Sequence, residues 1–272
     1  MTGTLYVVAT PIGNLEDLTL RASRVLGEVS LVVAEDTRHT RKLLSHLGIH
    51  KRLLSYNDHN AAQRTPLVLR AIRKGDVALV SDAGVPLVSD PGASLVKAAA
   101  EQGSPVVPIP GPSAVTAALA ASGMSADAFH FLGFTPRARK PRRGVFESYS
   151  SRQETLVVFE APHRLRAMLE DLRDALGDRE VAVCRELTKL HEEVFRGSVT
   201  RALGHFEIPR GEFVVVVAGA AEATAVAVDS AAVSATLAQL KRAGSTRRDA
   251  VELVTEAYGI SKRESYRIWL ET

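Results

Sequence analysis

The feature that most constrains the fold is a regular alternation, in the first half of the chain, between short apolar runs and stretches with helical periodicity. The runs are rich in β-branched residues, and polar or small residues follow each of them before the helical pattern begins. They are Leu5 to Ala9, Leu31 to Ala34, Leu53 to Tyr56, Val77 to Val80 and Val106 to Ile109. Strands that alternate with helices form a parallel sheet whose ligand loops gather at the carboxyl ends of the strands. The sequence therefore predicts a parallel α/β domain with a binding site at one sheet edge.

The loop after the fourth run gives the strongest indication of the ligand. The stretch Val77 to Gly92 reads VALVSDAGVPLVSDPG and carries Asp82 and Asp90, with no Lys or Arg from Ser81 onward. Small residues let a backbone approach a ligand closely, whereas two carboxylates repel phosphate. S-adenosylmethionine fits better, because it has a sulfonium, an ammonium and ribose hydroxyls that can donate to carboxylates. The alternative is that the aspartates and prolines only shape turns.

Polar groups follow the other runs as well. The first run opens into ATPIGN, whose single glycine is a poor match to the G-x-G-x-x-G of dinucleotide-binding proteins, and we expect Asp17 to cap the helix that follows. Glu35, Asp36 and Arg38 follow the second run, and Asp58 and His59 follow the third. The fifth run ends in PGPS, a helix start whose free N–H groups suit a carboxylate. Each cluster alone is explained by a helix cap and a solvated turn, but several at one edge favour a ligand site.

The second half of the chain predicts a further α/β domain. After a connector from Gly123 to Ala128, strands are expected at Phe129 to Phe134, Thr155 to Phe159, Glu180 to Cys184 and Phe213 to Ala218. Between two of these strands lies a segment with five basic residues and no acid. They are Arg137, Arg139, Lys140, Arg142 and Arg143. We interpret them as contacts to a phosphate backbone, and the alternative is a solvated loop. His163 lies beside Glu160 and Arg164 in the loop after the next strand.

The last 50 or so residues predict a separate helical tail. A linker is expected from Ala220 to Val228, followed by helices at Ala231 to Arg242, Thr246 to Tyr258 and Lys262 to Glu271. Ser261 and Glu264 form a capping box. The spacing resembles a helix-turn-helix pair with basic residues available for nucleic acid, but interspersed acids make an ordinary surface helix pair equally consistent. The predicted domains are residues 1–122, 123–222 and 223–272.

Composition narrows the class of protein. With 272 residues, 46% hydrophobic and 24% charged, the chain is typical of a soluble globular protein. Cys184 is the only cysteine, so an intrachain disulfide is impossible, and the eight histidines show no metal-binding spacing. No secretory signal and no membrane-spanning segment is expected, so we predict a cytoplasmic protein without a metal. The net charge of +3 permits a polyanionic partner without requiring one.

Seven ordered segments resemble the ribosomal RNA small-subunit methyltransferase I family, within the tetrapyrrole methylase superfamily. They are LYVVATPIGNLEDLTLRA, VVAEDTRHTRKLL, SYNDHN, ALVSDAGVPLVSDPG, VVPIPGPSAV, FEAPHRL and CRELTKLHEE. The resemblance spans nearly the whole chain. It implies two α/β domains of the tetrapyrrole methylase type with S-adenosylmethionine in the cleft between them, a homodimer, and 2'-O-ribose methylation of a cytidine in the decoding centre. The substrate would be small-subunit ribosomal RNA or the 30S subunit.

Site residues follow from the resemblance by position. It implies cofactor contacts at Pro11 and Gly13, at the loop Asp82, Ala83, Gly84, Val85 and Pro86, at Ser113 and Ala114, and at Cys184. The family usually has Thr where Val85 stands. Methyl transfer also needs a group that collects the hydroxyl proton, and Glu35, Asp36 and Glu160 are the candidates. Arg38, His59, His163 and Arg164 are candidates for contacts to the RNA.

Two other functions remain open at this stage. The substrate of a methyltransferase could be a tetrapyrrole precursor, although a small substrate needs neither the basic segment nor the tail. The chain could also be a non-catalytic RNA-binding factor in ribosome assembly. A nicotinamide dehydrogenase is disfavoured, because the glycine fingerprint is missing.

Overall fold

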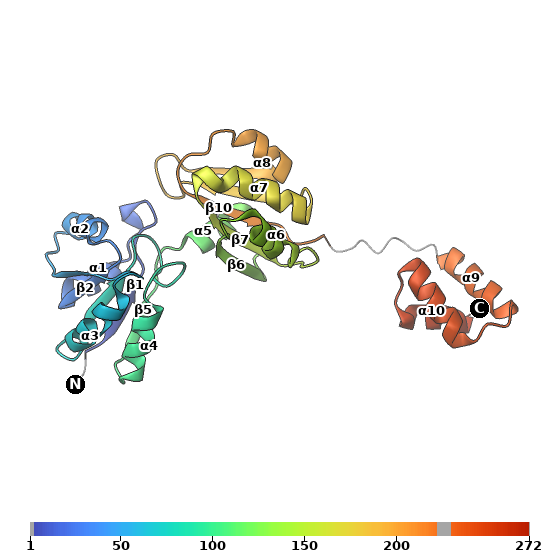
Figure 1. Cartoon of the computed structure of the whole chain (residues 1–272), viewed down its shortest axis with the longest axis horizontal. Coiled ribbons are helices and arrows are strands. Elements are labelled where there is room, and N and C mark those ends of the chain that lie inside the picture. The colour runs from blue at the N-terminus through green and yellow to red at the C-terminus, as the bar shows by residue number, and fades with distance from the viewer. Residues whose placement is uncertain (1–2, 222–229, 272) are drawn as a thin grey trace. The chain divides into compact units, whose positions relative to one another are not determined.

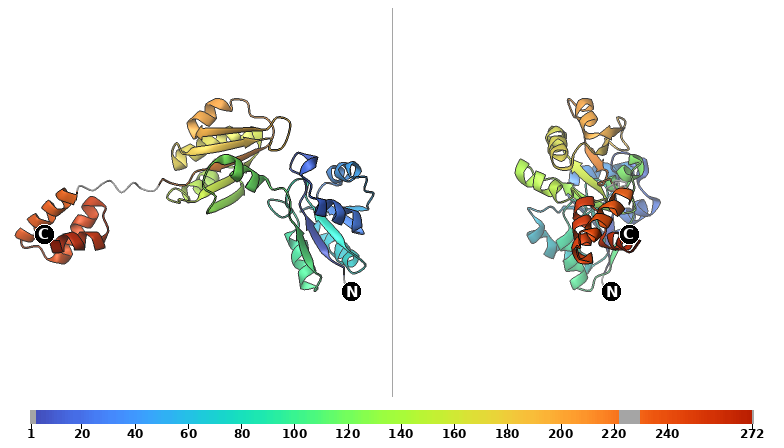
Figure 2. Two further views of the ribbon diagram at one scale, coloured as in Figure 1. Left: turned by 180° about the vertical axis from the view of Figure 1, so that it is seen from behind. Right: turned by 90° about the vertical axis from the view of Figure 1, so that its right-hand side faces the viewer.

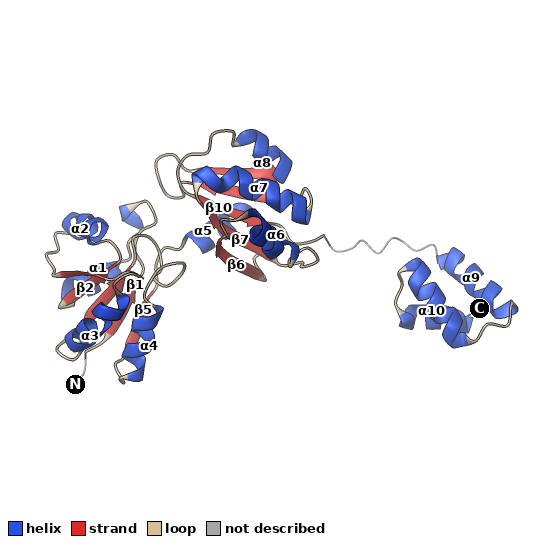
Figure 3. Cartoon of the chain, viewed as in Figure 1, coloured by secondary structure: helices blue, strands red, loops and turns tan. Residues whose placement is uncertain are grey.

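The computed structural model describes residues 3–221 and 230–271, and the chain divides into two compact units, Met1–Gly219 and Ala220–Thr272 (Figure 1). The first unit contains two five-stranded sheets covered by helices, and the second contains helices alone (Figure 3). This is the predicted α/β class with a helical C-terminal part. The predicted linker, Ala220 to Val228, falls almost wholly outside the described residues.

The first sheet is parallel throughout, with strand order β3-β2-β4-β1-β5. Its strands are β1 (Leu5–Val8), β2 (Leu31–Ala34), β3 (Leu53–Ser55), β4 (Val77–Val80) and β5 (Val106–Ile109). Its helices are η1 (Leu15–Asp17), α1 (Leu20–Glu28), α2 (Thr37–His46), α3 (Ala61–Ile72) and α4 (Ala93–Glu101). Strands β2 and β4 are buried along their whole length because helices pack on both faces of the sheet, which explains their continuous apolar sequence.

The first helix starts later than predicted. Thr19, not Asp17, caps α1, because its hydroxyl accepts a hydrogen bond from the backbone N–H of Ala22. Asp17 instead lies in the 3-10 turn η1, whose cap is Asn14. The local sequence offered two capping residues, and the turn after β1 determines which of them meets a helix N-terminus.

The second sheet is mixed, with strand order β6-β7-β10-β8-β9. Its strands are β6 (Phe129–Phe134), β7 (Thr155–Glu160), β8 (Glu180–Arg185), β9 (Glu193–Ser198) and β10 (Phe213–Val217), and only β6 and β7 pair in parallel. Helices α6 (Arg139–Glu147), α7 (Pro162–Leu176) and α8 (Val199–His205) pack on one face. The edge strand β9 and the short helix α8 were not predicted, because EVFRGS has too few apolar residues to stand out as a strand.

The other face of the second sheet is covered by α5 (Ala114–Ser122), although this helix follows a strand of the first sheet. Val115, Ala118 and Leu119 pack there against Val157 and Cys184. Figure 2 shows the two sheets of this unit from behind and from the side. The chain thus passes from one sheet to the other along α5. The domain boundary predicted after residue 122 stays a prediction, since the compact units divide at residue 219.

The second unit is a bundle of α9 (Ser230–Arg242), α10 (Arg247–Tyr258) and α11 (Lys262–Glu271). Its core includes Leu237, Val254 and Trp269. The capping contact of Ser261 is present, because its hydroxyl accepts from the N–H of Glu264 at 3.2 Å. The helices therefore form where the sequence predicts them, within a few residues at the ends.

Candidate functional site

A cavity of about 400 Å³ in the first unit is lined by residues of both sheets. The first sheet contributes the loop after β4, and Ser113 and Ala114 lie at the start of α5. The second sheet contributes Phe134, Phe159 and Cys184. This volume lies in the range of small-molecule and cofactor sites. Strand ends, a helix start and an apolar sheet face therefore converge on one concave site.

Seven of the ten predicted cofactor residues line this cavity. They are Asp82, Ala83, Gly84, Val85, Ser113, Ala114 and Cys184. Pro11 instead borders a smaller hollow beside His39, and Pro86 is buried outside both. Gly13 also lies outside the cavity lining. The cofactor contacts predicted for these three residues stay predictions.

The backbone requires glycine at two of these positions. Gly84 and Thr10 exchange N–H to carbonyl hydrogen bonds at 2.9 and 3.0 Å, which ties the loop after β4 to the end of β1. Gly84 has φ +78°, a conformation that disfavours any side chain. A Cβ on Gly13 would lie 2.4 Å from Cγ of Lys189 and 3.0 Å from the carbonyl oxygen of Leu187. Gly13 is therefore needed where a loop of the second sheet packs on the first.

Backbone strain gathers at the same place. Among the described residues, the non-glycine positions with positive φ are Leu87, Ser89, Glu186 and Thr188. They lie in two loops, and each loop contributes lining residues to the cavity, Ser89 from one and Leu187 from the other. The second of these loops is hydrogen-bonded to the loop after β1, because the N–H of Asn14 donates to Oγ1 of Thr188 at 3.0 Å. Strained loops that are held by packing are typical of functional sites.

Carboxylates outnumber cations in the cavity wall, where Lys189 pairs with Glu186 and Glu212. Glu35, Asp82 and Asp90 all line it. Burial, followed by the charges of Asp90 and Asp82, raises the pKa of Glu35, and burial and the charge of Asp82 raise the pKa of Asp90. Such mutual repulsion falls when a cation binds, so the donor set fits a positively charged ligand and not a phosphate.

The second candidate proton acceptor, Asp36, already forms an ion pair with the neighbouring side chain of Arg38. Its carboxylate accepts from Nε of Arg38 at 3.0 and 3.1 Å, and these contacts lower the pKa of Asp36 to about 2. Its backbone N–H donates to Oδ1 of Asp82 at 3.0 Å, which orients that carboxylate. Asp36 also lines an adjoining hollow with His59, which is exposed. Asp36 thus helps to orient Asp82, and its pairing with Arg38 makes its carboxylate a weaker base than an unpaired one.

The third candidate, Glu160, lies in a closed network at the end of β7. Its side chain is 0% exposed, and its two oxygens accept from the hydroxyl of Thr135 at 2.7 Å and from the N–H of Ala161 at 2.9 Å. Nε of Arg164 lies 3.2 Å from the same carboxylate. The terminal nitrogen of Arg164 donates to the carbonyl of Pro136 at 3.2 Å. These contacts hold both side chains in place, and Glu160 also lines the cavity. The predicted roles of Glu160 as proton acceptor and of Arg164 as RNA contact stay predictions.

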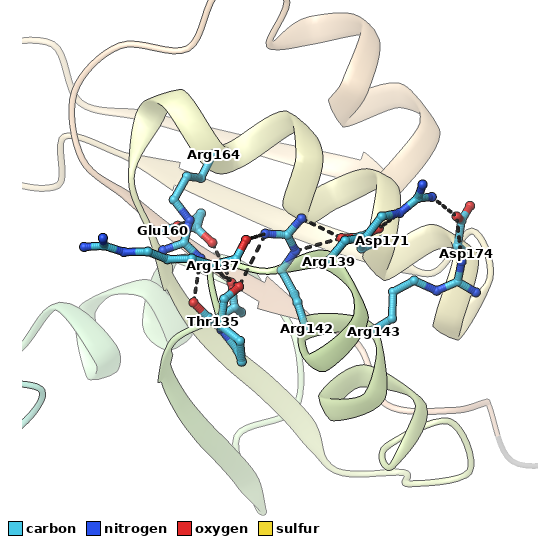
Figure 4. Close-up of polar contacts among 10 residues, drawn as sticks. Thr135, Arg137, Arg139, Arg142, Arg143, Glu160, Arg164, Asp171 and Asp174 are labelled. Carbon is cyan, nitrogen blue, oxygen red and sulfur yellow. Dashed lines mark hydrogen bonds and ion pairs between the residues drawn. The ribbon is translucent and has the colours of Figure 1, made fainter.

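The basic segment is not a loop, and three of its five cations are paired. Residues from 139 onward form α6, which packs on α7 and places Arg142 in the interior. Arg139 and Arg142 both donate to Asp171, at 2.9 and 2.8 Å, while Arg143 pairs with Asp174 (Figure 4). Arg142 is only 6% exposed, which overturns its predicted contact to phosphate. Arg137, Lys140 and His163 remain exposed.

Cys184 is a buried apolar group and not a nucleophile. It has no solvent exposure, and burial raises the pKa of its thiol to about 11. Its neighbours are the apolar residues of α5 and β10. The sequence analysis missed the lining residues Phe134 and Phe159, which lie on the second sheet, and Lys189, which lies in the loop after β8. No local pattern distinguishes the two phenylalanines from core positions.

Comparison with known proteins agrees with this architecture. Residues 4–203 match the family of tetrapyrrole (corrin/porphyrin) methylases, and the solved structure of the methyltransferase CobJ superimposes with a TM-score of 0.62, at 18% identity, over 81% of this chain and 95% of that one. The fold and site therefore define a methyltransferase of the tetrapyrrole methylase class.

Two relatives give a finer result. Ribosomal RNA small subunit methyltransferase I of Micromonospora olivasterospora is 48% identical over 97% of this chain and 85% of its own length. The protein of the same name from Thermotoga maritima is 48% identical over 80% of this chain and 99% of its own length. The chain belongs to the ribosomal RNA small subunit methyltransferase I family.

No helix within residues 3–221 and 230–271 is long and apolar enough to cross a membrane. The same residues contain no group of three or more His, Cys, Asp or Glu side chains arranged to hold a metal ion.

Proposed function

We propose that this protein transfers a methyl group from S-adenosylmethionine to the 2'-hydroxyl of a cytidine in the decoding centre of small-subunit ribosomal RNA. The observation that carries the proposal is the cavity whose wall combines the carboxylates of Glu35, Asp82 and Asp90 with an apolar sheet face. The ribosomal substrate is supported by the names of the two relatives that are 48% identical to this chain. The cytidine and its 2'-oxygen are the positions that the family resemblance implies.

The cavity offers a place for each part of the cofactor. We assign Asp82 and Asp90 to its positive charges and hydroxyls, the backbone from Ala83 to Val85 to close packing, and the start of α5 to its carboxylate. The hydroxyl of Ser113 makes no capping hydrogen bond at the start of α5. When bound, S-adenosylmethionine supplies an electrophilic methyl group on a positively charged sulfur. Val85 lines the cavity where the family usually has Thr, and a backbone contact there needs no hydroxyl.

Glu35 is the group best suited to collect the hydroxyl proton. It lines both the cavity and the adjoining polar hollow, so it faces the cofactor site and an open approach. Burial and its acidic neighbours raise the pKa of Glu35, which makes its carboxylate a stronger base than that of Asp36. Proton removal completes a displacement whose rate depends mainly on alignment of the reacting atoms.

The exposed cations Arg137, Lys140 and His163 are the remaining candidates for RNA phosphate. Replacing Arg137 and Lys140 together by Ala should weaken binding to small ribosomal subunits and lower the slope of log affinity against log salt by about 2. Arg143→Ala is the matched control, because Arg143 is already paired with Asp174. An unchanged slope in the double variant contradicts the assignment.

The function is tested by incubating small ribosomal subunits that lack the modification with the protein and labelled cofactor. Mass spectrometry of the ribosomal RNA should then locate one new methyl group on a cytidine ribose. Label on a tetrapyrrole precursor but not on RNA would instead support the first alternative. Binding to subunits without any transfer would support an assembly factor. The homodimer and the cytoplasmic location stay predictions, and light scattering tests the first of them.

A further inference from the structure

A β-bulge at the end of β6 changes the direction of one aromatic side chain. Phe131 pairs with Val157 and Phe134 pairs with Phe159, so three steps on β6 match two steps on β7. Residues three apart normally point to opposite faces of a strand, but the extra residue brings Phe131 and Phe134 to the same face. Both rings meet Phe159 edge to face, with centroids 4.8 and 5.7 Å apart. Gly133, at φ +63°, accommodates the bulge.

The bulge places the exposed ring of Phe134 in the lining of the cavity. Phe134 lines the cavity and is 56% exposed, whereas Phe131 and Phe159 are partly buried in the core cluster behind it. What distinguishes Phe134 from other exposed apolar side chains, such as Phe129, is its place in the cavity lining. The supporting rings fix its plane, so the exposed part of the ring is available for stacking.

The turn after Phe134 is held by two guanidinium groups, that of the buried Arg142 and that of the partly buried Arg164. Arg164 donates to the carbonyls of Thr135 and Pro136, and Arg142 donates to those of Pro136 and Arg137. Glu160 and Asp171 balance the two charges from the interior. Buried charged groups are costly unless paired, and here the two guanidinium groups, each paired with a buried carboxylate, donate to three consecutive carbonyls (Figure 4). The network therefore makes the segment from Phe134 to Arg137 a rigid platform.

We infer that Phe134 is a positioning residue on which the base of the target nucleotide stacks. The inference rests on the proposed function and states how the site binds the target nucleotide of its RNA substrate. Exposed aromatic rings recognise unpaired bases by stacking, and a nucleotide must leave its stack before its ribose reaches an enclosed site. The exposed cations Arg137 and Lys140 follow Phe134 along the chain, which suits the phosphates that flank such a base.

The test compares Phe134→Leu, Phe134→Trp and the control Phe129→Leu in the full-length protein. Phe129 begins the same strand, is 41% exposed and lies outside the cavity lining. Loss of one stacked base predicts that Phe134→Leu raises KM for ribosomal subunits by roughly 5- to 150-fold, and by more than it raises KM for the cofactor. Phe134→Trp should stay within about threefold of the parent. A parental KM in Phe134→Leu, or a defect of equal size in Phe134→Trp, overturns the inference.

A binding measurement separates this inference from the proposed function. Phe134→Trp and Phe129→Trp each add one tryptophan to a chain whose own Trp269 lies in the second unit. Single-stranded oligocytidylate should quench the fluorescence of the first variant but not that of the second. Quenching without methyl transfer by the parent protein would reject the proposed reaction and keep the platform. Methyl transfer without quenching would reject the platform alone.

Discussion

The buried ion pair between Arg142 of α6 and Asp171 of α7 should contribute strongly to the stability of the first unit. Asp171 is 2% exposed and accepts hydrogen bonds from both Arg139 and Arg142. Asp171→Ala would leave Arg142 buried without its counter-charge, while the exposed Arg139 could return to water. Asp174→Ala is the matched control on the same helix, because Asp174 is 35% exposed and its partners also reach solvent.

The expected magnitudes differ clearly. Removing one partner of a buried ion pair costs about 3–5 kcal/mol of unfolding free energy, whereas an exposed pair contributes about 1 kcal/mol or less. In a unit of this size, 1 kcal/mol corresponds to roughly 2–4 °C in Tm. Asp171→Ala should therefore lower the Tm of the first unit by roughly 6–20 °C, and Asp174→Ala by no more than about 4 °C.

Circular dichroism of the full chain measures the melting of the first unit, which contains most of the residues. Tryptophan fluorescence reports the second unit separately, because Trp269 is the only tryptophan. The fluorescence transition should be the same in all variants. Equal Tm losses for Asp171→Ala and Asp174→Ala would refute the reasoning that burial makes the Arg142 pair different.

Three further predictions concern the cavity. The pKa of Glu35 is raised, so its basic form is lost as pH falls through a value above the ordinary 4.5, and kcat should decline there. Glu35→Gln should lower kcat and abolish this acidic decline in the pH profile. A parental pH profile in the variant excludes Glu35 as the base. The raised pKa of Asp90 means that its charge destabilises the ligand-free fold above that pKa and that this penalty disappears on acidification. Asp90→Asn should therefore raise Tm at pH 7 while calorimetry shows weaker cofactor binding, and a lower Tm with unchanged binding contradicts this. Gly84→Ala should lower the free energy of unfolding, measured by chemical denaturation, by about 1–2 kcal/mol, because Gly84 has a φ of +78°. The control Gly144→Ala, where a Cβ meets open space on α6, should not destabilise the protein. Equal effects of the two substitutions would reject the argument from backbone strain.

Much of the first sheet could be read from the sequence, since its parallel strands are short, continuous apolar runs between helical patterns. The cavity loop with Asp82 was predictable for a related reason, because carboxyl ends of parallel strands meet at one edge. Three predicted contacts to the cofactor do not line the cavity, and Gly13 shows why: its neighbours are Leu187 and Lys189, far away in the chain. Such close approaches leave no local pattern.

The basic segment shows a second limit of sequence reasoning. Five cations in seven residues look like a polyanion contact, yet Arg142 turns inward because α6 packs on α7. Its partner, Asp171, lies 29 residues further along the chain. The bulge that exposes Phe134 likewise depends on the register between β6 and β7, which local sequence does not specify.

The central claim is that one cavity takes a positively charged methyl donor, and calorimetry on the purified protein tests it most directly. Titration with S-adenosylmethionine should show a single saturable site, and Asp90→Asn should weaken that binding. The account is contradicted if S-adenosylmethionine gives no saturable heat while a nucleoside triphosphate or a nicotinamide dinucleotide binds well.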